Sequence, residues 1–165
     1  MYPKQLVPNG EMEFEINGEL VKIPKCAVSF EKWNGQPINN FGGKPLVCVG
    51  NKPMFAELAI LQGFIADDWE ARWISTYGRS KSSPIFLDDW EDNSYRNQRH
   101  HDIANGEVRQ ILSDIAKYNP KSYTGCWDIF GWKDGKILFA ESKRKKKDNI
   151  RESQRKWLIA AFKFG

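Results

Sequence analysis

Residues 126–143, CWDIFGWKDGKILFAESK, decide the fold and contain the candidate site. Two apolar runs flank Asp134-Gly135, a dipeptide that favours a tight two-residue turn between antiparallel strands. Counting outward from this turn places Asp128 directly opposite Glu141. Directly opposed residues project from the same face of a hairpin, with Cβ atoms about 4.5–5.5 Å apart, so we expect the two carboxylates to share one site.

Two opposed carboxylates repel each other, and like charges that face each other in a sheet are destabilising by about 0.2–1 kcal/mol. Lys143 lies two residues beyond Glu141 and points to the same face, where it could balance this charge. A divalent cation such as Mg²⁺ fits best, because it binds oxygen ligands, often from only one or two carboxylates, and fills its shell with water and substrate phosphate. An ion cluster of Asp, Glu and Lys at the sheet surface is the alternative.

Apolar side chains on both faces of this hairpin favour a place inside a sheet. They are Phe130, Trp132, Ile137 and Phe139 on one face, and Trp127, Ile129, Leu138 and Ala140 on the other. Carboxylates that face each other inside a sheet rarely occur without a function. The pattern therefore favours a metal site over a surface ion cluster.

A C-terminal helix is expected over residues 148–164, DNIRESQRKWLIAAFKF. Asn149 is its expected N-cap, because Glu152 follows three residues later as in a capping box. Gln154 falls on the apolar stripe and should point inward, together with Ile150, Trp157, Leu158, Ala161 and Phe162. A buried amide must be hydrogen-bonded, and metal ligands with ordered water would satisfy it, as would nearby backbone.

A short, buried helix is expected earlier in the chain. Pro53 suits a first helical position, and residues 54–62, MFAELAILQ, with Gly63 behind them, are apolar nearly all round. Glu57 is the single acid of this helix. It is a further candidate for the site, although a helix end close to solvent would explain it equally well.

The rest of the chain suggests strands, loops and one more helix. Residues 11–23 alternate polar and apolar side chains around Asn17-Gly18, which predicts an N-terminal β-hairpin. Residues 31–52 are rich in Gly, Asn and Pro, which is typical of a loop with one short strand at 45–49. Residues 69–77 have the period of a strand, and a polar loop over 79–100 precedes a helix. The role of the long insertion 79–120 stays open.

Length and composition indicate one packed domain, residues 1–165, in which 41% of the residues are apolar. The chain has three cysteines, Cys26, Cys48 and Cys126. Their odd number argues against a disulfide framework, and their spacing argues against a zinc site. No apolar run reaches the roughly 18 residues of a membrane span, and the N-terminus lacks the apolar region of a secretion signal. These features favour a soluble, cytoplasmic protein without a membrane partner.

Positive charge is concentrated near the C-terminus: residues 143–156 contain eight Lys or Arg and two acids, whereas the whole chain has a net charge of +4. Such a local basic run suggests a surface that binds a polyanion, because phosphate contacts are made by local basic patches. A solvated helix face or a localisation signal explains the run equally well. The candidate nucleic-acid-binding residues are Arg144, Lys145, Lys146, Lys147, Arg151 and Arg155.

Taken together, these features resemble the PD-(D/E)xK nuclease superfamily, most closely its VRR-NUC branch. The resemblance rests on Glu57, on WDIFGW around Asp128, on FAESK with Glu141 and Lys143, and on SQRKWL with Gln154. It implies an α/β fold with a restriction-endonuclease-like core, in which helices flank a mixed β-sheet, here preceded by the N-terminal β-hairpin. It also implies hydrolysis of DNA phosphodiester bonds that depends on Mg²⁺, with Mn²⁺ able to replace it.

The resemblance also implies a role for each candidate residue. Asp128 and Glu141 would hold one or two metal ions, and Lys143 would stabilise developing charge or orient a water. Glu57 would add a more distant or second-metal carboxylate, and Gln154 would fix the ligands or the water. The family often has Pro where Trp127 stands, and the sequence ends at Gly165, where a strand normally follows the last helix. Either this strand is absent, or the N-terminal hairpin supplies a substitute edge, or the sequence is a truncated product.

The alternative from another class is a non-catalytic nucleic-acid-binding or inhibitor protein that keeps a nuclease-like core and needs no metal. DNA is the expected partner, while RNA, the preferred nucleic-acid structure, and endonuclease or exonuclease action stay open. One site per chain means that simultaneous cuts in both strands require two chains, which also leaves a homodimer open.

Overall fold

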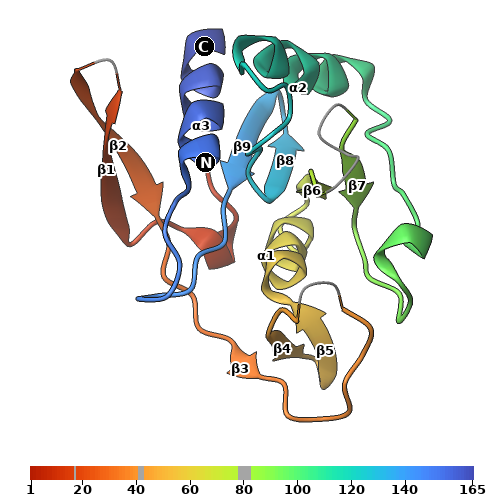
Figure 1. Cartoon of the computed structure of the whole chain (residues 1–165). Coiled ribbons are helices and arrows are strands. Elements are labelled where there is room, and N and C mark those ends of the chain that lie inside the picture. Colours follow the sequence, from red (N-terminus) through yellow and green to blue (C-terminus); the bar gives the residue numbers. More distant parts are fainter. Residues whose placement is uncertain (17, 41–42, 78–82) are drawn as a thin grey trace.

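The computed structural model describes residues 1–16, 18–40, 43–77 and 83–165. Within these residues the chain is a mixed α/β protein with three α-helices and three antiparallel sheets (Figure 1). The helices are α1 (Ala56–Ile65), α2 (Gly106–Tyr118) and α3 (Glu152–Phe164). The α/β class is confirmed, but every described strand pairing is antiparallel, so the expected mixed sheet is wrong. None of the described helices is long and apolar enough to cross a membrane.

The largest sheet contains the hairpin that the sequence predicts. Its strand order is β7-β6-β8-β9, with β6 at Glu70–Ser75, β7 at Ile85–Leu87, β8 at Ile129–Lys133 and β9 at Lys136–Ala140. Ile129 pairs with Ala140 and Lys133 with Lys136, which confirms the predicted turn and register. Among the described strands β8 lies inside the sheet and β9 at its edge, so only half of the hairpin is internal.

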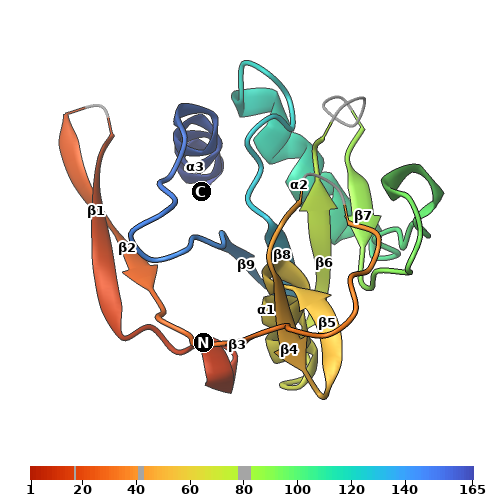
Figure 2. The ribbon, with the colours of Figure 1, turned by 60° about the horizontal axis from the view of Figure 1, so that its bottom comes forward.

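Two apolar clusters cover the two faces of this sheet. Helices α2 and α3, which contact each other, lie on one face of the sheet, and α1 lies on the other (Figures 1 and 2). Phe130 and Trp132 are buried in the cluster that contains residues of α2 and α3, and Ile129 is buried in the cluster that contains residues of α1. Gly131 allows α1 to approach β8 closely, because a Cβ atom there would lie 2.5 Å from the ring of Phe64. Burial on both faces explains why β8 is an uninterrupted apolar run.

A second sheet precedes α1 and consists of β3 (Glu31–Lys32), β4 (Leu46–Val49) and β5 (Lys52–Phe55). Pro53 does not start the helix as expected: it lies in β5, and α1 begins at Ala56. Pro53 is tolerated there because β5 is an edge strand, and proline within sheets is confined to edges and bulges. Gly50 and Asn51, with φ of +55° and +60°, form the two-residue turn between β4 and β5.

The N-terminal hairpin forms as expected, from β1 (Gly10–Ile16) and β2 (Glu19–Lys25), although Asn17 of its turn lies outside the described residues. It is a separate two-stranded sheet beside α3 (Figures 1 and 2), so it does not substitute as an edge of the largest sheet. Phe14 anchors it, because this ring is buried in the cluster that includes Trp157 of α3.

Helix α3 begins later than the sequence suggests. Its N-cap is Arg151 and not Asn149, because the Oε1 atom of Gln154 accepts a hydrogen bond from the Arg151 N–H at 2.9 Å. Trp157 and Leu158 are buried as expected, but Phe162 is 51% exposed.

The insertion forms more regular structure than expected. Helix α2 is confirmed, and the side chain of Asn105 caps its N-terminus. Strand β7 and a short 3-10 helix, Tyr95–Asn97, occur where we expected only a loop, while residues 79–82 of that loop lie outside the described residues.

Candidate active site

Asp128 and Glu141 lie at the open end of the β8–β9 hairpin, directly before β8 and directly after β9. The backbone N–H of Asp128 donates to Glu141 Oε2 at 3.2 Å, and the N–H of Ser142 donates to Asp128 Oδ2 at 3.1 Å. Each carboxylate is therefore held in place by a backbone N–H of the opposite segment. Such hydrogen bonds also favour the charged form of the carboxylate. The structure brings the two acids together at the place that the register predicts.

Glu141 is held by two further side chains that the sequence singled out. Its Oε1 atom accepts hydrogen bonds from Lys143 Nζ at 2.5 Å and from Gln154 Nε2 at 2.6 Å. The Glu141 side chain is only 3% exposed, so these bonds are shielded from water. Because Gln154 also accepts the Arg151 N–H, both ends of its amide have partners and its orientation is fixed.

The start of α3 is tied to the same place by the segment before β8. The indole Nε1 of Trp127 donates to the backbone oxygen of Gln154 at 3.2 Å. Gly125, with φ of +81°, lies so close to Ser153 that any side chain at this position would collide with the α3 backbone. Close approach of these two segments is what allows Gln154 to reach Glu141.

Glu57 comes to the site from the first turn of α1. It is buried, with 8% of the residue exposed, so the explanation by a helix end close to solvent is wrong. Its Oε1 atom forms an ion pair with the ammonium group of Lys44. The charge of Glu57 also acts on Asp128, whose pKa it helps to raise. Helix α1 thus supplies a third carboxylate beside the first two.

Burial raises the pKa values of both hairpin acids, and the charges of neighbouring carboxylates raise that of Asp128 further. For Asp128, burial is the largest cause, followed by the charges of Glu141 and Glu57, while the Ser142 N–H and Lys44 act in the opposite direction. For Glu141, burial again raises the pKa and Lys143 opposes it. Negative charge is therefore costly in this site, and a bound cation would relieve the cost.

The donor atoms at this site fit a hard divalent cation. Among the described residues, no group of three or more His, Cys, Asp or Glu side chains converges as a complete metal site. Mg²⁺, however, often binds through only one or two carboxylates and takes its other ligands from water and phosphate. The paired oxygens of Asp128 and Glu141 satisfy that requirement.

Sequence reasoning missed Lys44, which lies in a segment that it assigned to a loop. A signal was present: Gly50-Asn51 is a favoured two-residue hairpin turn, and Leu46 pairs with Phe55 around it. Continuing this register outward places Lys44 opposite Glu57, as Asp128 stands opposite Glu141. The signal was hidden because Pro53 suggested the start of a helix.

The basic residues lie in the segment between β9 and α3, whose two ends are joined by the Glu141–Gln154 bond. Arg144 is held by Asp148, with Nε and Oδ2 2.7 Å apart, whereas Lys145, Lys146 and Lys147 are exposed. No ion pair involves these three lysines within the described part of the chain. The structure therefore presents their charges to solvent, on a segment whose two ends meet at the carboxylates.

The other two candidate basic residues lie on the α3 side of this segment. Arg151 is the exposed N-cap residue, and the guanidinium of Arg155 lies 5.3 Å from the ring centroid of Phe14 in the N-terminal hairpin. That distance is within the range of a cation–π contact. Arg155 therefore links α3 to the hairpin as well as being available at the surface.

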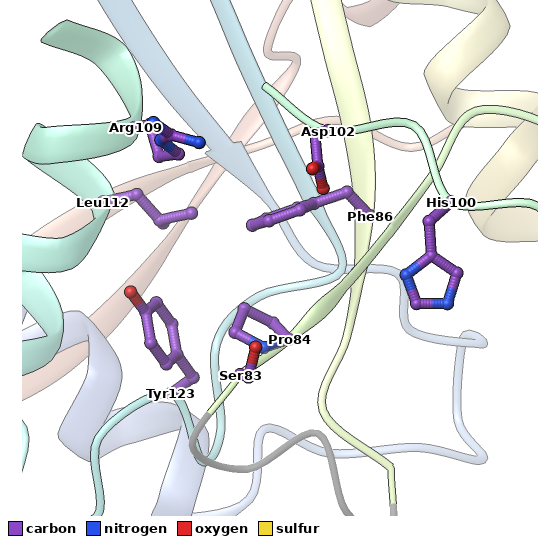
Figure 3. A pocket seen from close by; sticks show the side chains of 8 residues that line it. All are labelled: Ser83, Pro84, Phe86, His100, Asp102, Arg109, Leu112 and Tyr123. Carbon is purple, nitrogen blue, oxygen red and sulfur yellow. The ribbon is translucent and has the colours of Figure 1, made fainter. Parts of the chain in front are cut away.

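A separate hollow of about 340 Å³ lies between α2 and β7 (Figure 3). Its lining is mixed and consists of Ser83, Pro84, Phe86, His100, Asp102, Arg109, Leu112 and Tyr123. Its size is within the range of small-ligand sites. It shares no residue with the carboxylate site, so its location does not bear on the chemistry of Asp128 and Glu141.

We compared the chain with protein-family models, with curated proteins and with solved structures, and none of the three comparisons finds a match.

Proposed function

We propose that this chain is a metal-dependent nuclease that hydrolyses phosphodiester bonds of DNA, built on a restriction-endonuclease-like core. The observation that carries the proposal is the environment of Glu141. This acid lies beside Asp128, and its Oε1 atom accepts hydrogen bonds from both Lys143 and Gln154. A pair of carboxylates, a lysine and an amide, drawn from three segments of the chain, is the set that the resemblance to the PD-(D/E)xK superfamily implies.

Asp128 and Glu141 are the residues that would hold Mg²⁺ or Mn²⁺. When bound there, the cation supplies Lewis-acid polarisation of the scissile phosphate and a water of lowered pKa. The chain's own contribution is orientation: the Asp128 and Ser142 N–H groups and the Gln154 amide hold the carboxylate oxygens in place before any ligand arrives.

Lys143 places a positive charge at the edge of the same site. Its ammonium group is bound to Glu141 and its side chain is 21% exposed, so it is accessible from solvent. An ammonium in this position would stabilise the negative charge that develops on the phosphate. Glu57 would act on Asp128 through its charge.

Lys145, Lys146 and Lys147 would hold the substrate by its phosphates. Lysine contacts to the backbone carry no sequence information, so binding through this segment would be largely independent of base sequence. Its position directly after Lys143 would bring a bound backbone to the carboxylates. Binding and chemistry would then share one surface.

The test is a cleavage panel with labelled duplex, single-stranded, flap and junction DNA and with RNA, each in Mg²⁺, Mn²⁺ or EDTA. We expect cleavage of DNA that needs the cation and is lost in Glu141→Gln and Lys143→Met, while binding of the substrate is retained. Lys163→Met, an exposed lysine near the end of α3, is the matched control and should cleave normally. Binding without cleavage for every substrate and cation would instead support a non-catalytic nucleic-acid-binding or inhibitor protein.

A further inference from the structure

The charges of two ion pairs bear on Asp128. Glu141 is paired with Lys143, and Glu57 is paired with Lys44. Both glutamates act on Asp128 by raising its pKa, and Lys44 acts on it in the opposite direction. The backbone places Lys44 at the same site: its ammonium group lies over the ring of Trp73, Trp73 pairs with Ile129, and the N–H of Ile74 donates to the backbone oxygen of Asp128 at 2.7 Å.

Lys44 is fixed in this position by several contacts. Its ammonium group lies 5.4 Å from the ring centroid of Trp73, within the range of a cation–π contact. The side-chain amide of Asn40 donates to its backbone oxygen at 3.1 Å. The Glu57 side chain is only 11% exposed and the Lys44 side chain 37%, so the carboxylate end of the pair is shielded from the solvent that weakens surface ion pairs.

The hairpin register explains why this lysine faces this glutamate. Leu46 and Phe55 are the outermost pair of the β4–β5 hairpin, and Lys44 and Glu57 lie two residues beyond them on either side. Glu57 is also in the first turn of α1. The site is thus assembled from the open ends of two hairpins, one with two acids and one with an acid and a lysine.

We infer that Lys44 acts as a built-in cation that limits this carboxylate site to one divalent metal ion. This inference rests on the proposed metal-dependent function. A second divalent ion would need Glu57 and Asp128 as ligands, but Glu57 already binds an ammonium group, and that positive charge repels another cation placed beside it. Without the charge of Lys44, Glu57 becomes available to a second ion.

The experiment measures the number of Mn²⁺ ions bound per chain, by calorimetry and by electron paramagnetic resonance, in the full chain without substrate. The wild-type chain should bind one ion. Lys44→Gln removes the charge but keeps a hydrogen-bond donor for Glu57, and Lys44→Met removes both. Each of these variants should bind two ions, and adding Glu57→Gln to either should return the number to one.

Two variants serve as matched controls. Lys44→Arg keeps the positive charge and should bind one ion. Lys4→Met removes a different ion pair, that of Lys4 with Asp67, and should also bind one ion. Circular dichroism confirms that each variant is folded before the titration.

The outcomes separate the inference from the proposed function. No Mn²⁺ bound by the wild-type chain would remove the metal-dependent function and the inference with it. One ion in the wild-type chain and one in the folded neutral Lys44 variants would overturn the inference alone. Two ions in the wild-type chain would also overturn it, while leaving the metal-dependent function in place.

Discussion

The charge of Asp128 opposes folding of the metal-free protein. Burial, Glu141 and Glu57 all raise its pKa, which means that the folded state disfavours the ionised carboxylate relative to the unfolded chain, where an aspartate is ionised at pH 7. A residue that is retained at such a cost to stability is better explained by function than by packing.

We therefore expect Asp128→Asn to be more stable than the wild-type chain in EDTA at pH 7. The amide has the same shape and still accepts the Ser142 N–H, but it carries no charge. A gain of about 1 kcal/mol is expected, or roughly 2–4 °C in Tm for a chain of this size, together with loss of cleavage. Asp114→Asn, at an exposed ion pair on α2, is the control and should bring no gain. A lower Tm for Asp128→Asn would contradict this account.

Gln154 holds Glu141 without adding charge, and this predicts a specific kinetic effect. Gln154→Ala removes the hydrogen bond to Glu141 and the one from the Arg151 N–H. Loss of such a supporting bond typically lowers metal affinity or activity by about 10–100-fold. Single-turnover cleavage should therefore slow by about that factor, while affinity for DNA, measured without a metal ion, stays the same.

The control for this change is Gln110→Ala, which removes an exposed hydrogen bond to Asp114 on α2 and should leave cleavage unchanged. If Gln154→Ala cleaves DNA at the wild-type rate, Gln154 has only a structural role at the start of α3.

Residues that depend on one clear local pattern were predicted from the sequence, whereas Lys44 was missed. Asp128 and Glu141 follow from counting outward from one turn, and Gln154 follows from its place on an apolar stripe. Lys44 meets Glu57 only because Lys52–Phe55 is a strand, and the local preference of Pro53 for a helix start concealed that strand. Because Lys52–Phe55 forms an edge strand instead of a helix start, the register of its hairpin places Lys44 opposite Glu57.

At the scale of elements, the close approach of Gly125 to α3 makes the stability of the protein sensitive to substitution of this glycine. A Cβ atom at Gly125 would lie 2.8 Å from the Gln154 backbone nitrogen, and the positive φ is unfavourable for any other residue. Gly125→Ala should therefore push the first turn of α3 outward and weaken the Trp127 and Gln154 bonds. We expect a loss of about 2 kcal/mol in the free energy of unfolding, measured in urea, together with reduced cleavage.

The matched control is Gly106→Ala, at the start of α2, where a Cβ atom would meet no other atom within 4 Å. Alanine is favoured over glycine in a helix, so this variant should be as stable as the wild-type chain or up to about 1 kcal/mol more stable. Equal stability of the two variants would show that α3 can shift without consequence.

At the scale of the whole molecule, the sequence predicted hairpins better than it predicted the sheet. Asp134-Gly135 and Asn17-Gly18 each specify a pairing between neighbouring segments, and both pairings occur. The pairing of β6 with β8 joins segments separated by the long insertion, and no local signal specifies it. The mixed sheet was expected only from a resemblance to a family, and the described pairings are antiparallel instead.

The basic segment allows a test of how substrate reaches the site. Lys145, Lys146 and Lys147 are exposed, and the Glu141–Gln154 bond keeps the ends of their segment beside the carboxylates. If they contact phosphates, binding releases counterions, and affinity falls steeply with salt. Replacing all three with Gln should weaken binding to the same extent for different DNA sequences and flatten the salt slope by up to about 0.9 per lost contact on duplex DNA.

The control for this triple variant replaces Lys121, Lys136 and Lys163, three exposed lysines outside the basic segment, so that the same amount of charge is lost. General attraction between a positive protein and DNA would be reduced equally in both variants, whereas specific phosphate contacts would be lost only in the first. Cleavage at saturating DNA should survive in both, because neither changes Asp128, Glu141 or Lys143. Equal salt slopes for the two triple variants would mean that the DNA backbone follows a path away from this segment.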